Sequence, residues 1–139
     1  DKKIALCREY GVSISDAEYK NPSLLHAKCG AILAEHEYQI IDFDILHAIR
    51  VHTTGVPDMS LLDKIIFIAD YIEPNRDKAP HLKELRKLAD KDLDETTYLI
   101  LKDTVDYLKA HEDQPMDPTT VSAYEYYRDW HNSQNRKGV

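Results

Sequence analysis

Two histidines and one aspartate in this sequence could bind a metal ion together. His26 lies one turn into a predicted helix, His52 ends the apolar face of the next, and Asp70 lies near the end of a third. Side chains from three successive helices can converge inside a bundle, as the ligands of bundle-core metal sites do. Imidazole and carboxylate groups are ligands that favour iron, manganese, zinc or cobalt.

Each of these residues also has a purely structural interpretation. Asp70 follows Ile66 by four residues and Phe67 by three, which places it on a helical face with two large apolar side chains. A carboxylate buried there would be strongly destabilising unless it is paired or bound to a metal, so a buried ion pair or a helix cap is the alternative. A lone histidine such as His52 is more often a structural residue than a ligand.

The remaining histidines and the cysteines are weaker candidates. His36 and His47 lie near charged faces, and His47 is five residues from His52, a poor separation for sharing a helical face. Cys29 follows His26 by three residues, but it is expected to be a small buried apolar residue. The other histidines have polar surroundings: His81, His111 and His131.

An arginine and a proline-bracketed loop could contact an anionic substrate. Arg76 lies six residues after Asp70, and a guanidinium at the edge of a metal pocket can hold phosphate oxygens bidentately. The alternative is an exposed arginine in a charged loop. The loop 113–118 is stiff and has free backbone groups, so it could line a base-binding slot or simply connect two helices.

Helices separated by clear stop signals must position these residues. The sequence has no convincing alternating strand, internal repeat or low-complexity tract, and therefore predicts an all-α fold. Segment 61–72 is apolar nearly all round, which predicts a buried central helix. The predicted helices cover 1–10, 22 to about 37, 43 to the stop at 53–55, 61–72, a short one from 80, one from 92, and 118 to about 131. Their starts are marked by Asn21-Pro22, Asp42, Ser60 with Asp63, Pro80, Asp92 and Asp117-Pro118.

Length and composition restrict the function classes. The 139 residues allow one domain, and a formal charge of -7 argues against binding to nucleic acid polymers or anionic membranes. A small anionic substrate in a metal-bearing pocket remains compatible with that charge. Two cysteines make no disulfide framework, and no segment resembles a signal peptide or a membrane span. The sequence therefore predicts a cytoplasmic protein.

Three stretches of the sequence resemble the YqeK-type HD-domain phosphohydrolases, the symmetrical bis(5'-nucleosyl)-tetraphosphatase family. They are Leu25-His26, Ile49-Arg50-Val51-His52-Thr53-Thr54-Gly55 and Ile68-Ala69-Asp70-Tyr71-Ile72-Glu73-Pro74-Asn75-Arg76. The string from His52 through Arg76 is specific. The resemblance implies that residues 1–131 are the C-terminal part of an HD-domain helical bundle that lacks its N-terminal helices in this chain. Residues 132–139 are predicted to form a polar, flexible tail.

The resemblance implies a hydrolase that cleaves diadenosine tetraphosphate symmetrically into two ADP. It also implies two divalent or mixed-valence metal ions, typically iron, with manganese, cobalt or zinc as alternatives. His26 and His52 match ligands of one ion, and Asp70 matches a ligand of the other. The positions that match substrate-binding residues of the family are His26, His52, Thr53, Asp70, Arg76, Asp113, Gln114, Pro115, Met116, Asp117 and Pro118. The expected partner is a dinucleoside polyphosphate or an ADP-like nucleotide, and a homodimer is left open.

One departure from the family is serious. The His-Asp pair that names it, and an earlier histidine, belong upstream of residue 1, and no adjacent His-Asp pair occurs in this sequence. Either the chain is a C-terminal fragment or the protein has lost a complete site. A start without methionine, within a helical pattern, favours the fragment. As given, the chain is expected to bind at most one metal ion, through His26 and His52 with water.

The resulting hypothesis is a metal-dependent hydrolase of dinucleoside polyphosphates when complete. The family chemistry implies a metal-bridging hydroxide that attacks one phosphorus in line, and no protein side chain is identified as catalytic. Two alternatives stay open. One is an HD phosphohydrolase of another nucleotide, such as a deoxynucleoside monophosphate. The other is a non-catalytic helical module that keeps the fold without the full site.

Overall fold

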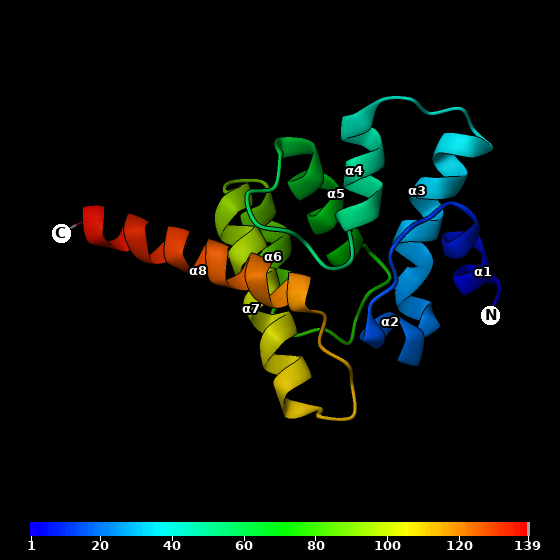
Figure 1. The fold of residues 1–139 in the computed structure, drawn as a ribbon. Coiled ribbons are helices and arrows are strands. Elements are labelled where there is room, and N and C mark those ends of the chain that lie inside the picture. The colour runs from blue at the N-terminus through cyan, green and yellow to red at the C-terminus, as the bar shows by residue number, and fades with distance from the viewer. Residues whose placement is uncertain (139) are drawn as a thin grey trace.

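The computed structural model describes residues 1–138, and helices are the regular elements along them (Figure 1). In chain order they are α1 (Lys2–Glu9), α2 (Asp16–Lys20), the 3₁₀ helix η1 (Pro22–Leu25), α3 (His26–His36), α4 (Phe43–Val51), α5 (Leu61–Tyr71), α6 (Leu82–Ala89), α7 (Leu93–Ala110) and α8 (Pro118–Lys137). The predicted all-α class is confirmed. Within the described residues, no helix combines the length and apolar character that crossing a membrane requires.

Helices α4 and α5 begin where the cap residues predict, whereas the short helix predicted from Pro80 begins at Leu82. The Asp42 carboxylate accepts hydrogen bonds from the backbone N–H groups of Asp44 and Ile45 at the start of α4. Ser60 and Asp63 form a reciprocal capping box at the start of α5. These local bonds satisfy N–H groups that the first helical turn leaves unpaired. They therefore fix the ends of the two helices on which the predicted site depends.

Two groups of buried side chains hold the helices together. The smaller group joins α1, η1 and α3 and comprises Cys7, Leu25, Cys29 and Ile32. The larger group joins α5, α6, α7 and α8 with the loop before α5: Met59, Phe67, Ile68, Leu85, Tyr98, Ile100, Leu101, Ala123 and Tyr127. Helix α4 lies between the two groups and packs against α3 and α5 (Figure 1). His26 of α3 and His52, which follows α4, lie where these two helices meet.

Helix α5 is not the buried central helix that its apolar sequence predicts. Asp63, Phe67 and Ile68 are its buried residues, whereas Leu61 is 62% exposed and Ile65 is 43% exposed. The apolar composition of a helix does not determine how many neighbours it has, and α5 packs against α4 and α7 while another side faces solvent. Helix α7 buries more residues than α5 does: Thr96, Thr97, Tyr98, Ile100, Leu101 and Val105.

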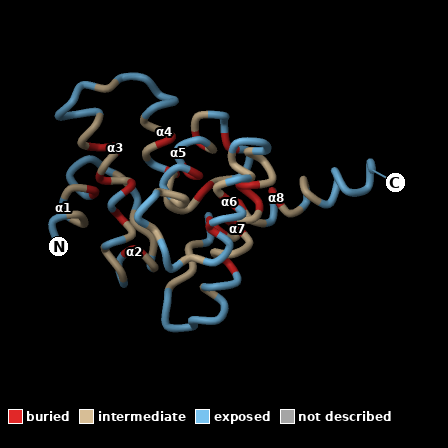
Figure 2. The backbone as a smooth tube through the Cα atoms, turned by 180° about the vertical axis from the view of Figure 1, so that it is seen from behind, coloured by how far each residue is buried: buried red, intermediate tan, exposed pale blue. Residues whose placement is uncertain are grey.

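Helix α8 projects away from the body of the molecule. Figures 1 and 2 show its C-terminal half extending beyond the other helices, and residues 132–138 are exposed. The helix continues to Lys137, past the predicted end near residue 131, so residues 132–137 of the predicted tail are helical. Arg136 and Lys137 in the last turn favour this extension because positive charge stabilises a helix C-terminus. Val139, the end of the predicted tail, lies outside the described residues.

Candidate functional site

His26 and His52 meet where α3 begins and α4 ends. His26 is the first residue of α3, and His52 directly follows the last residue of α4. Their Nε2 atoms are 3.3 Å apart, and the two rings meet edge to face. Close packing of the two helices favours this meeting, since a Cβ added at Gly30 of α3 would lie 3.4 Å from the Ile49 side chain of α4.

Each of the two rings is oriented by a carbonyl group three residues earlier in the chain. His26 Nδ1 lies 2.9 Å from the Ser23 carbonyl oxygen, and His52 Nδ1 lies 2.6 Å from that of Ile49. A carbonyl oxygen can only accept, so both Nδ1 atoms donate, and in the neutral rings both Nε2 atoms carry lone pairs. Two lone pairs facing each other at this distance repel, whereas a cation near both would bind them. Metal-binding histidines are oriented in the same way.

The turn after α4 adds a hydroxyl group to the histidine pair. Thr53 Oγ1 lies 3.0 Å from His26 Nε2 and can donate to it. The turn ends at Gly55, whose φ of +66° is a left-handed conformation that glycine adopts without strain. A Cβ at Gly55 would lie 3.3 Å from the Leu101 side chain, so the turn is held against α7. The position of Thr53 therefore depends on the packing of this turn.

Asp70 does not join the histidine pair in this structure. Its side chain is exposed and Ile66 is 37% exposed, so the prediction that Asp70 lies on a buried apolar face is wrong. Asp70 lies three residues after the buried Phe67, yet its own side chain is open to solvent. Across the described residues, no group of three or more His, Cys, Asp and Glu side chains is arranged to hold a metal ion. The histidines thus offer two ligands with suitable chemistry but not a full set.

Arg76 is not a freely exposed arginine in a charged loop, which was the alternative to a phosphate contact. It is half-buried, and its guanidinium carbon lies 5.2 Å from the centre of the Tyr71 ring. Its Nη2 donates a long hydrogen bond of 3.4 Å to the Asp70 carbonyl oxygen. Its buried Nε has no hydrogen-bond partner among the described residues. The side chain therefore keeps unused donors next to the residue predicted to bind a metal ion.

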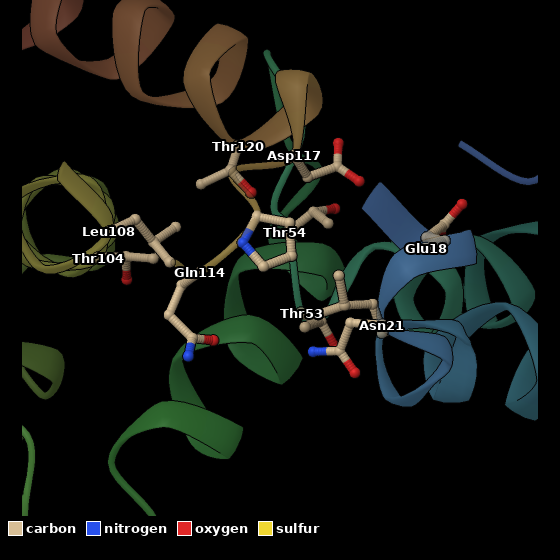
Figure 3. Close-up of a pocket in the computed structure, with 11 residues that line it drawn as sticks. Glu18, Asn21, Thr53, Thr54, Thr104, Leu108, Gln114, Asp117 and Thr120 are labelled. Carbon is tan, nitrogen blue, oxygen red and sulfur yellow. The ribbon is translucent and has the colours of Figure 1, made fainter. Parts of the chain in front are cut away.

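A cavity of about 200 Å³ lies between the segment that contains α2 and η1 and the segment that contains α7 and α8 (Figure 3). Its lining residues come from α2, η1, α7, α8 and the connecting loops: Glu18, Asn21, Leu24, Thr53, Thr54, Thr104, Leu108, Gln114, Pro115, Asp117 and Thr120. Three members of the predicted loop, Gln114, Pro115 and Asp117, thus line the cavity together with Thr53. Asp113, Met116 and Pro118, from the same loop, are not among its lining residues.

A second cavity, of about 300 Å³, adjoins the C-terminal end of α5. It is lined by Tyr71, Arg76, Lys78, Ala79, Pro80, Asp103, Thr104 and Tyr107. Thr104 lines both cavities, so they lie on either side of this residue of α7. Each cavity has one lining residue that contacts a predicted metal ligand. Thr53 of the first cavity contacts His26, and Arg76 of the second contacts the backbone of Asp70.

The two cavities differ in charge. Both carboxylates of the first are already paired: Glu18 with Lys28 at 2.8 Å, and Asp117 with the backbone N–H of Thr119 at 2.8 Å. The second contains two cations, Arg76 and Lys78, and one carboxylate, Asp103, which lies 2.9 Å from His81 Nδ1. Burial, followed by the negative charge of Asp103, raises the pKa of Tyr71. The first cavity, lined by two carboxylates and no cation, therefore disfavours an anionic group, whereas the second favours one.

Three of the remaining histidines lie within hydrogen-bond distance of carboxylates. The Nδ1 atoms of His47, His81 and His131 lie 2.9, 2.9 and 2.8 Å from the carboxylates of Asp63, Asp103 and Glu95, respectively. Cys29 is buried as predicted, and its Sγ lies 3.8 Å from Cys7 Sγ. Burial raises the pKa of the Cys29 thiol to about 11, which keeps it protonated and makes it a poor metal ligand.

Two residues that line the cavities, Thr104 and Tyr107, are not predicted from the sequence. Thr104 lies four residues before Leu108 on α7, which is the spacing of a shared helical face. That spacing alone reads as core packing, because Ile100 and Leu101 on the same helix are fully buried. Thr104 and Leu108 instead line the first cavity together with Gln114 and Pro115 of the loop after α7. No residue pattern in the sequence indicates this cavity.

The sequence was compared with known proteins, and no family model matches it. Three curated relatives are each named symmetrical bis(5'-nucleosyl)-tetraphosphatase. The one from Bacillus subtilis is 46% identical over 76% of this chain and 56% of its own length. The one from Halalkalibacterium halodurans is 45% identical over 81% and 59%, and the one from Staphylococcus aureus 38% identical over 91% and 64%. The chain thus spans 56–64% of the length of these relatives.

A solved structure shares the fold. It is a crystal structure from Clostridium acetobutylicum, described as a predicted HD superfamily hydrolase involved in NAD metabolism. It matches with a TM-score of 0.84 and 40% sequence identity, over 92% of this chain and 67% of the solved chain.

Proposed function

The chain belongs to the HD superfamily of hydrolases, and we propose that the whole protein cleaves diadenosine tetraphosphate symmetrically into two ADP molecules. The names of the three curated relatives support this substrate and this mode of cleavage. The observation that carries the proposal is the pair of facing imidazole Nε2 atoms, 3.3 Å apart, next to Thr53, which lines the first cavity.

His26 and His52 would hold one metal ion. Hydrolases of this superfamily generally use divalent metals, and two imidazole lone pairs fixed by carbonyl groups are suitable donors for one. Asp70 is proposed as a ligand of a second ion, and iron as the metal. Further ligands would come from outside residues 1–139. When bound, such ions stabilise the negative charge that develops on phosphoryl oxygens.

The residues of this chain would divide the substrate between the two cavities. A base and ribose, which carry no charge, are proposed to lie in the first cavity against Thr53 and the loop 113–118, while phosphate oxygens lie toward Arg76 and Lys78. The unpaired Nε of Arg76 supports this assignment, because a buried donor without a partner gains the most from an anionic ligand. This local positive charge explains how a chain of net charge -7 could bind a highly anionic substrate.

Product analysis with the whole protein tests the reaction. Diadenosine tetraphosphate incubated with the protein should give ADP alone by chromatography, since only cleavage at the central position yields two equal products. Release of AMP with ATP would contradict symmetrical cleavage. Hydrolysis of deoxynucleoside monophosphates, with diadenosine tetraphosphate left intact, would favour the alternative phosphohydrolase. A purified protein that retains no metal and cleaves none of these substrates would be a non-catalytic module.

Calorimetry with Arg76→Ala tests the proposed phosphate contact. The variant should bind ADP about tenfold more weakly, a loss of about 1.4 kcal/mol in binding free energy, while its thermal unfolding changes little. Arg128→Ala is the matched control, because Arg128 is an arginine of α8 that lines neither cavity. Equal ADP affinity for Arg76→Ala and wild type would remove Arg76 from the site.

We propose that this reaction takes place in the cytoplasm. Cys7 and Cys29 are both free thiols in the structure although they lie close together, which fits a reducing compartment. Whether the active form is a homodimer is measured by size-exclusion chromatography with light scattering.

A further inference from the structure

The segment that follows α5 connects two residues of the proposed site. Asp70 lies in the last turn of α5, and Arg76 lies at the end of a short turn that begins at Glu73. Within this turn the Arg76 N–H donates to the Glu73 carbonyl at 3.0 Å, and the Asn75 N–H donates to the Glu73 carboxylate at 2.8 Å. The distance between the proposed metal ligand and the proposed phosphate contact therefore depends on how this turn is held.

A second arginine, Arg86 of α6, binds this turn from the side. Its Nε donates to the carbonyl oxygen of Ile72 at 3.0 Å. Its Nη2 donates to the carbonyl oxygens of Glu73 at 2.8 Å and Arg76 at 2.9 Å. One half-buried guanidinium thus bonds three carbonyl groups within five consecutive residues, including both ends of the turn.

These bonds use properties that only arginine combines. The carbonyl groups at the end of a helix have no partner within the helix, and Ile72 caps the C-terminus of α5. A cation near that end is also favoured by the helix dipole. Because the guanidinium is planar with donors in a rigid fork, it fixes the relative positions of its acceptors, which a flexible lysine ammonium does not.

We propose that Arg86 is a positioning residue of the nucleotide site. It holds the backbone at Glu73 and Arg76 so that the Arg76 guanidinium lies over Tyr71 and lines the cationic cavity beside Asp70. Arg86 is not among the residues that line either cavity, so it acts through Arg76 and not on the substrate itself. This inference rests on the proposed function, because it requires Arg76 to contact the nucleotide.

A double-mutant cycle on ADP affinity tests the inference in the whole protein. Arg86→Ala should weaken ADP binding about tenfold in the wild-type background, but less than about twofold when Arg76 is already alanine, because the two residues act through one contact. Arg86→Lys should give an intermediate loss, about threefold, because it keeps the charge without the fork. Lys87→Ala is the control, since Lys87 is an exposed cation of the same helix and should leave ADP binding unchanged.

Hydrogen exchange of the turn separates this role from a loss of folding. In Arg86→Ala and Arg86→Lys the Asn75 and Arg76 amides should exchange faster, while amides in the centre of α7 keep their wild-type rates. If Arg86→Ala does not fold, the Arg86→Lys variant carries the same comparison.

The outcomes distinguish the two proposals. Weak ADP binding by Arg76→Ala together with wild-type binding by Arg86→Ala would overturn the positioning role and leave the proposed function standing. Fully additive losses in the double variant would do the same. If Arg76→Ala binds ADP like the wild type, the proposed phosphate contact is wrong, and the role of Arg86 falls with it.

Discussion

Two sets of histidines in this fold have different partners. His26 and His52 direct their Nδ1 atoms to carbonyl groups of their own segments and their Nε2 atoms toward each other. His47, His81 and His131 direct their Nδ1 atoms to carboxylates on other helices. The second set links elements of the fold, whereas in the first set the two Nε2 lone pairs face each other and cannot hydrogen-bond to one another.

The difference shows what distinguishes a candidate ligand from a structural histidine. All five rings are held by a hydrogen bond at Nδ1, so an ordered ring does not by itself distinguish a metal ligand from a structural histidine. At His131, the other nitrogen is also occupied, because the Asn135 side-chain amide lies 2.9 Å from its Nε2. The distinguishing feature is the convergence of two Nε2 atoms on one point, which a structural ion pair does not require.

Removing one histidine of the converging pair should have the largest effect. His52→Ala in the whole protein should lower the affinity for a divalent metal by more than about 100-fold, since loss of a ligand exceeds the loss caused by its hydrogen-bond partners. Metal content after dialysis, measured by mass spectrometry, checks this. His131→Ala should keep the wild-type metal content. Equal metal content in both variants would abolish the distinction between the two sets.

Removing a carboxylate partner from the structural set should affect folding and leave metal binding intact. Asp63→Ala should lower the free energy of unfolding by about 2 kcal/mol, because it removes an acceptor of the α5 capping box and the partner of His47. Urea denaturation measures the change. Asp63→Asn keeps an oxygen for the cap and should cost less. A loss of metal from Asp63→Ala would place this pair in the site instead.

The smallest effect is expected at His81, which is exposed. The hydrogen bond to the Asp103 carboxylate, supported by its charge, raises the pKa of His81 above 6.5. A raised pKa in the folded state adds stability that is complete below about pH 6.5 and is lost as the pH rises through the raised value. His81→Asn keeps a residue that tolerates the left-handed backbone at this position, where φ is +58°. The melting temperature of wild type should exceed that of the variant at pH 5.5 by more than at pH 8; a constant difference would contradict the linkage.

Much of the fold could be predicted because its determinants are local. Asp42, Ser60 with Asp63, and Asp117 mark helix starts through bonds that span three residues or fewer, and all are present in the structure. The burial of α5 could not be predicted in this way. An apolar helix such as α5 carries no signal for how many neighbours it contacts, and two of its apolar residues are more than 40% exposed.

The site, like the fold, was predicted correctly in one part and wrongly in another. His26, His52 and Asp70 were predicted to converge because they lie on three successive helices, and the structure brings the two histidine Nε2 atoms to 3.3 Å from each other. The environment of Asp70 was predicted wrongly, because helical spacing defines a face but not what covers it. The contribution of Arg86 had no signal at all, since it bonds carbonyl groups, and every residue type has one.

The hydrogen bond that orients each histidine of the pair lies within four consecutive residues, Ser23–His26 and Ile49–His52. Such a segment is modular, because the orientation of the imidazole ring is set by the segment's own backbone and needs no tertiary partner. Two copies, one at the start of a helix and one at the end of the helix it pairs with, would be a compact unit for protein design. Grafted onto an unrelated helical hairpin, the unit should present two preorganised imidazole nitrogens.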